Sequence, residues 1–128
     1  SIHSPATVGS STFTLVNMST TVANLTLFGG PAATVGINST GNSTTIMHVN
    51  FLGFGPGQLP ILLSDEHDMV TYNNFTNIIS PFAIKVQGSN FDTHTLSYIT
   101  HNTFTNIAGA IFLNNTHSNN SIQYNTVL

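Results

Sequence analysis

The sequence predicts an all-β fold, a β-solenoid of about five coils, on three observations. A strand-like segment recurs along the chain, and a second strand-like run recurs in step with it at a period of 22 to 29 residues. β-Branched and aromatic residues are frequent, and no segment keeps the 3.6-residue apolar period of a helix. Short strands at one such period, separated by turns rich in Asn, Gly and Ser, are typical of stacked repeats.

The first strand signal is clearest at residues 70–78, which read VTYNNFTNI. Residues 99–107 repeat it as ITHNTFTNI, and 122–127 repeat its beginning as IQYNTV. Weaker copies lie at 46–54 and 22–30. The leading aliphatic residues stand at 22, 46, 70, 99 and 122, which marks five coils.

The second signal is a short alternating run in each coil: FTL at 13–15, VGI at 35–37, ILL at 61–63, IKV at 84–86 and IFL at 111–113. Each coil therefore contains at least two strands joined by turns. We assign 13–128 to one solenoid domain and 1–12 to an N-terminal arm or cap.

The pattern aliphatic-x-x-Asn-x-aromatic predicts how a coil bends. The aliphatic and aromatic side chains point inward, and the Asn lies at a sharp corner because it tolerates the left-handed region and bonds nearby backbone. Asn73, Asn102 and Asn125 are expected to stack as an internal ladder. Leu25 and Val49 hold that position earlier, so the ladder covers only the C-terminal half.

The residue before that corner forms an outer stripe of His48, Tyr72, His101 and Tyr124, spaced by about 5 Å per coil. Structural stacking, a carbohydrate surface and a lateral contact between filaments all fit such a stripe. A metal site does not, because the two His are not in adjacent coils. We also expect Phe28, Phe54 and Phe112 outside the barrel.

The C-terminal segment 110–127, AIFLNNTHSNNSIQYNTV, resembles the right-handed parallel β-helix repeat of the pectin-lyase-like superfamily. The resemblance covers most of 13–128 and implies a right-handed parallel β-helix. We expect a non-catalytic member, because the repeat is shared by enzymes, binding proteins and fibres. The alternative is an antiparallel β-sandwich fibre subunit, and a parallel ladder between residues near 84 and 111 separates the two.

Charge excludes several functions. Asp, Glu, Lys and Arg make up 4% of the chain, with Lys85 its only Lys or Arg, whereas Asn, Thr and Ser supply 48 of 128 residues. Without a basic patch, neither nucleic-acid binding nor polybasic membrane docking is expected. The absence of cysteine excludes disulfides and thiolate metal sites. The start at Ser1, without a long apolar run, predicts a processed, secreted chain at the cell surface or outside the cell.

Seven Asn-x-Ser/Thr sequons predict N-linked glycans, and no other cofactor is expected. They are Asn17, Asn24, Asn38, Asn42, Asn74, Asn114 and Asn119. Five of them, all except Asn24 and Asn74, are expected in the turn after the alternating strand, where a sugar can project.

One segment gathers three of the four carboxylates, at Asp65, Glu66 and Asp68, near Lys85 of the next coil. Lyases of the resembled superfamily hold Ca²⁺ with carboxylates and use a basic residue to abstract a proton. The three carboxylates are therefore weak metal candidates. The chain has no Arg to hold an acidic polysaccharide, so we expect no enzyme activity.

Solenoids need covered ends, because terminal coils expose unpaired backbone and half-covered core. We therefore expect a structural subunit that polymerises head to tail into an extracellular filament or surface appendage. The alternatives are a polysaccharide lyase or hydrolase, or a carbohydrate-binding domain, within a larger secreted protein.

Overall fold

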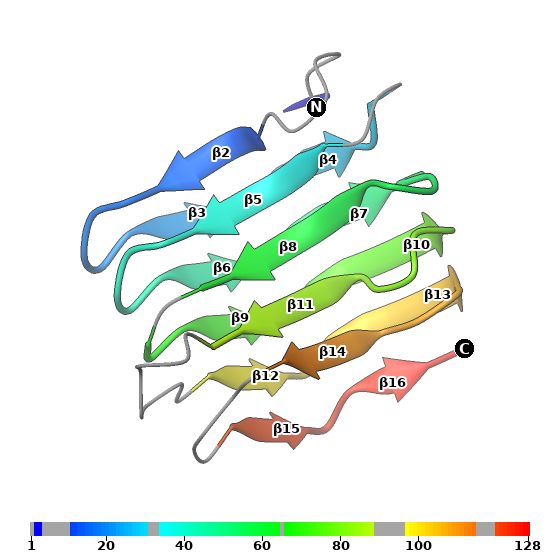
Figure 1. Ribbon diagram of the computed structural model, residues 1–128. Helices are drawn as coiled ribbons and strands as arrows, with labels where there is room; N and C mark the ends of the chain where they lie inside the picture. The colour runs from blue at the N-terminus through cyan, green and yellow to red at the C-terminus, as the bar shows by residue number, and fades with distance from the viewer. Residues whose placement is uncertain (1, 4–10, 31–33, 65, 89–96, 115–119) are drawn as a thin grey trace.

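The chain forms a parallel β-solenoid of about four turns (Figure 1). The structure, a computed structural model, describes residues 2–3, 11–30, 34–64, 66–88, 97–114 and 120–128. Over these ranges the regular elements are all strands. No helix in the described part of the chain is long and apolar enough to cross a membrane.

Three parallel sheets run along the solenoid axis, and each turn contributes one strand to each sheet. Sheet A consists of β1 (Ile2–His3), β4 (Thr26–Phe28), β7 (Asn50–Leu52), β10 (Asn74–Ile78), β13 (Thr103–Ile107) and β16 (Thr126–Val127). Sheet B consists of β2 (Ser11–Leu15), β5 (Val35–Ser39), β8 (Leu59–Leu63), β11 (Ile84–Gln87) and β14 (Ile111–Asn114). Sheet C consists of β3 (Thr21–Ala23), β6 (Thr45–Met47), β9 (Met69–Thr71), β12 (Tyr98–Thr100) and β15 (Ser121–Gln123).

The register confirms the predicted solenoid and excludes the antiparallel sandwich. Ile84 of β11 pairs in parallel with Ile61 on one side and with Ile111 on the other. The predicted count of about five coils differs slightly from the observed four turns. Five phase markers enclose only four full periods, which accounts for the difference.

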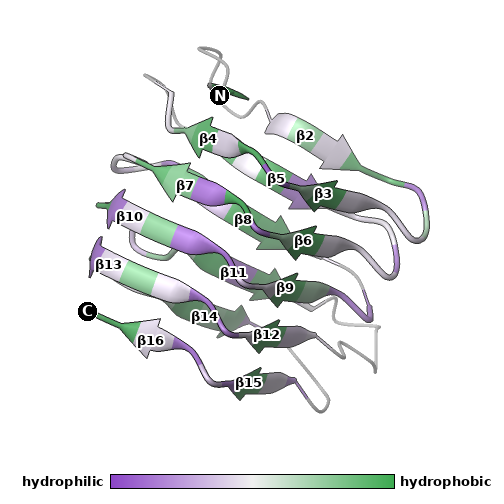
Figure 2. Cartoon of the chain, turned by 180° about the vertical axis from the view of Figure 1, so that it is seen from behind, coloured by the Kyte–Doolittle hydropathy of each residue, from purple (hydrophilic) through white to green (hydrophobic). Residues whose placement is uncertain are grey.

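The core is built from in-register columns of apolar side chains. In sheet A, Phe51, Phe75 and Phe104 are fully buried, and their rings stack with centroids 4.7 and 4.8 Å apart. In sheet C, Ile46, Val70 and Ile99 form a second buried column. Hydrophobic segments accordingly alternate with polar ones along the strands (Figure 2). Each column consists of residues from the same position of successive coils. Residues one sequence period apart therefore pack against one another in the core.

The expectation that Phe54 lies outside the barrel is wrong, since its side chain is fully buried and its ring lies 6.2 Å from that of Phe51. The residue before it, Gly53, has φ +66°, and Asn77 and Asn106 have φ of 56° and 53° at the same place in later turns. A left-handed residue breaks the strict in-out alternation of a strand, so the next side chain turns inward. Phe28 and Phe112, predicted with Phe54, are half-buried.

Candidate functional site

The corner between sheets C and A carries the predicted stripe and ladder on consecutive residues. The left-handed residue there is the stripe residue, with φ of 53° to 56° for His48, Tyr72, His101 and Tyr124. The expectation that the ladder Asn takes the left-handed conformation is wrong, because Asn73, Asn102 and Asn125 are not among the positive-φ residues. The bend and the ladder thus belong to neighbouring positions.

The ladder asparagine side chains bond one another and the backbone of the preceding turn. The backbone N and Nδ2 of Asn73 both donate to Oδ1 of Asn102, each at 3.0 Å. Asn102 donates in the same way to Asn125, at 2.9 and 3.0 Å. Each Nδ2 also donates to a carbonyl of the preceding turn, at Ile46, Val70 and Ile99 respectively. Buried amide groups are thereby satisfied through the interior of the corner.

The ladder begins where the sequence pattern changes. The backbone N of Val49 donates to Oδ1 of Asn73 at 2.9 Å, and Val49 has no side-chain amide with which to extend the series. The described ladder therefore covers the turns from Asn73 to Asn125, in the C-terminal part of the solenoid.

The stripe is a continuous ring stack along the axis. His48 and Tyr72 have centroids 5.5 Å apart, Tyr72 and His101 4.9 Å, and His101 and Tyr124 5.2 Å. Their planes lie within 12° to 25° of parallel, so the ring faces meet one another and the edges face outward. A sugar that stacks on an aromatic face finds little of one between the rings of this column. The two end residues, His48 and Tyr124, are exposed, Tyr124 by 74%.

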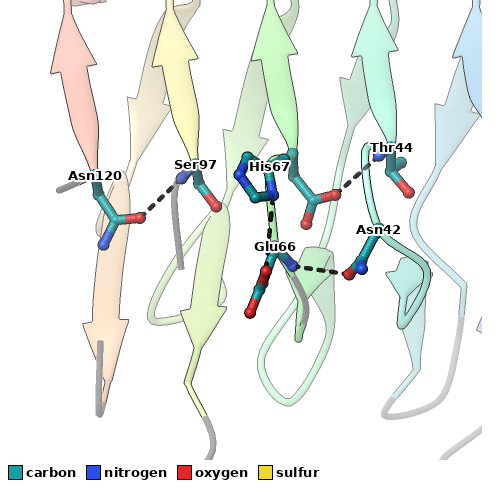
Figure 3. Close-up of polar contacts among 7 residues, drawn as sticks. Asn42, Thr44, Glu66, His67, Ser97 and Asn120 are labelled. Atoms are coloured by element: carbon teal, nitrogen blue, oxygen red, sulfur yellow. Dashed lines mark hydrogen bonds and ion pairs between the residues drawn. The ribbon is translucent and has the colours of Figure 1, made fainter. Parts of the chain in front are cut away.

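The acidic segment lies at the corner between sheets B and C (Figure 3). Asp68 is fully buried there, and its Oδ1 accepts a hydrogen bond from the backbone N of Thr44 at 3.0 Å. In another turn, Oδ1 of Asn120 accepts from the backbone N of Ser97 at the same distance. Asp68 thus binds the backbone of the preceding turn, as the Asn ladder does at the corner between sheets C and A.

The remaining members of the candidate metal and lyase set lie apart from that buried carboxylate. Glu66 is half-buried, with its carboxylate 3.7 Å from Nδ1 of His67. Lys85 lies on β11, with Nζ 6.0 Å from the ring centroid of Phe112. Asp65 lies outside the described residues. Among those that are described, no group of three metal-ligating side chains converges.

The sequons differ in accessibility. Asn17, Asn24 and Asn74 are exposed, and Asn42 is half-buried in a turn. The turn positions expected for Asn38 and Asn114 are wrong, because these residues lie in β5 and β14. Nδ2 of Asn114 donates to Oε1 of Gln87 at 3.2 Å, and Asn119 lies outside the described residues.

The two rims of the solenoid differ. At the C-terminal rim, Leu113, Ile122 and Val127 are 39%, 42% and 63% exposed. Their register partners one turn earlier, Val86, Ile99 and Phe104, are fully buried. The inward-facing columns of the core therefore end in exposed side chains at this rim.

The N-terminal rim is better covered. Leu27 is fully buried and Val22 is 7% exposed, although both belong to the first full turn. Ile2 of β1 pairs with Leu27 and packs against the core from outside. Neither β1 nor the backbone-binding role of Asp68 is anticipated by the repeat pattern, because neither recurs in every coil.

Comparisons of the chain with protein-family models, with curated proteins and with solved structures find no match. The features that bear on function are therefore the rims, corners and columns of the solenoid.

Proposed function

We propose that this chain is a structural, non-catalytic subunit that assembles head to tail into an extracellular filament or surface appendage. We also propose that its coil is related to the β-helix of the pectin-lyase-like superfamily. The observation that carries the first proposal is the step in exposure at the C-terminal rim, where Ile122 is 42% exposed directly over the fully buried Ile99.

A further coil placed on this rim would cover the exposed ends of the core columns and pair with the outer edges of β14, β15 and β16. Apolar burial and edge pairing favour the same axial arrangement, because the columns and the backbone ladders run along one axis. A second copy supplies such a coil in the correct strand direction, since every described pair of strands is parallel.

The first described strands at the N-terminal end place matching side chains in the same columns. Phe13 and Leu15 of β2 occupy the columns that end in Ile111 and Leu113. Val22 of β3 occupies the column that ends in Ile122. A contact between opposite rims is heterologous, and when its rotation does not close it produces an open polymer.

Charge and surface chemistry are compatible with such an assembly. The formal net charge is −3 and the chain holds a single Lys, so opposing rims carry little repulsion. N-glycans at the exposed Asn17, Asn24 and Asn74, together with location outside the cell, belong to the proposal.

Negative-stain microscopy and sedimentation velocity over a concentration series test the proposal. We expect rods whose mass grows with protein concentration. Ile122→Asp places a carboxylate on the C-terminal rim and should abolish them. Ile79→Asp is the matched control, because Ile79 is 65% exposed but lies midway along the solenoid after β10. A monomer at all concentrations, or equal assembly of the two variants, contradicts the proposal.

A further inference from the structure

The three sheets do not end at the same level at the N-terminal rim. Sheet A has six strands whereas sheets B and C have five each. The additional strand is β1, in which Ile2 and His3 pair in parallel with Leu27 and Phe28 of β4 (Figure 1). β1 therefore covers the edge of sheet A, while β2 and β3 are the outermost described strands of sheets B and C.

This additional strand conflicts with end-to-end stacking. When β14 and β15 of one copy pair with β2 and β3 of the next, β16 of the first copy falls on the edge of β4 of the second. That position is the one β1 holds. With β1 in place, the edges of sheets B and C remain one strand spacing too far apart to pair, about 4.8 Å.

We propose that β1 is a displaceable cap on the N-terminal rim, and that β16 of an incoming copy takes its place on β4. This inference rests on the proposed head-to-tail assembly and names the step that controls it. The side chains match the exchange, because Val127 of β16 ends the same inward column that Ile2 begins above Leu27.

Of the two strands that compete, β16 is the more firmly held. The backbone N of Thr126 donates to the carbonyl of Asn102 at 2.9 Å, and that of Leu128 to the carbonyl of Phe104 at 2.8 Å. The preceding residue, Asn125, is held by the Asn ladder. β1 and β16 each pair over two residues, but only β16 follows a ladder asparagine, so β1 is the strand that yields.

The exchange leaves the cover over Leu27 nearly unchanged and adds the contacts of β14 and β15 with β2 and β3. Displacement is therefore favourable only when two rims meet. A single copy keeps the sheet A edge of its N-terminal rim covered, and the cap raises the concentration at which assembly begins.

A disulfide between positions 2 and 27 tests the inference. The chain has no cysteine, and adjacent strands bring paired Cα atoms within the range a disulfide spans. The variant Ile2→Cys/Leu27→Cys should assemble when reduced and not when oxidised, so the same molecule is its own control. The oxidised form keeps a free C-terminal rim, so a small fraction of it added to wild-type protein should shorten the filaments.

Ile2→Asp provides a second test, because it weakens β1 without a cross-link. We expect assembly at roughly tenfold lower concentration than the wild type, a shift that Ile2→Val should not produce. Equal assembly of the oxidised and reduced double variant, or an unchanged threshold for Ile2→Asp, overturns the cap and leaves head-to-tail assembly standing. Absence of polymer from the wild type, the reduced double variant and Ile2→Asp overturns both proposals.

Discussion

At the scale of single residues, the corner asparagines hold neighbouring turns in register, a role that ion pairs fill in other proteins. One amide both donates and accepts, so Asn102 bonds the turn before it and the turn after it without any ionised group. This explains how a chain with 4% charged residues specifies its register. A buried amide series is selective because a slipped register leaves several polar groups unsatisfied.

Asn102→Ala should lower the free energy of unfolding by about 2–4 kcal/mol, because the backbone N of Asn73 and the carbonyl of Val70 lose their partner in the interior. Urea denaturation of protein made without glycans measures the loss. Asn74→Ala is the control, since its side chain is exposed and donates to Oδ1 of Asn50, and we expect a change below about 0.5 kcal/mol. Equal losses in both variants would contradict the role given to the ladder.

At the scale of elements, the stripe combines a backbone bend with a ring stack. Asn24 occupies the first corner with φ 58°, and rings occupy the four later ones. Asn suits a left-handed position better than a ring residue does, so the rings are retained there at a conformational cost that stacking offsets. The stripe therefore reinforces the corner.

Tyr72→Asn should cost about 1–2 kcal/mol, because it removes two ring contacts but keeps a residue that tolerates the bend. Tyr72→Val should cost roughly a further 1–2 kcal/mol, since a β-branched side chain is strained at positive φ. Thermal unfolding of the wild type and the two Tyr72 variants measures their order of stability. Tyr98→Val is the comparison within β12, where a β-branched residue suits the strand and little loss is expected. A Val variant as stable as the Asn variant would contradict the argument from strain.

At the scale of the whole molecule, the packing of the core and the proposed assembly share one axis. The columns that bury the core within a turn also end on the rim, at Leu113, Ile122 and Val127. Whatever covers that rim must continue the columns and the ladders together. In the proposed assembly, the cap strand β1 decides when the opposite rim is available.

Assembly should respond to temperature more than to salt. The rims carry apolar side chains and few charges, so raising NaCl from about 0.05 to 1 M should change the threshold concentration less than about threefold. Cooling should raise the threshold, because hydrophobic association weakens at low temperature. Light scattering at fixed protein concentration measures both responses. A tenfold salt effect would point to ion pairs between copies and against the apolar rim.

Much of this architecture is readable from the chain itself. The 22 to 29 residue period, the inward aliphatic and aromatic positions and the Asn series determine a parallel solenoid, because stacking identical positions is what the repeat encodes. Tertiary structure decided what the repeat does not contain. It places Phe54 inside after the left-handed Gly53, buries Asp68 against the backbone of Thr44, and seats β1 on sheet A. Phe54 depends on a local backbone conformation, Asp68 on a hydrogen bond to the preceding turn and β1 on a two-residue pairing. A period in the sequence reports only the residue types that every turn shares.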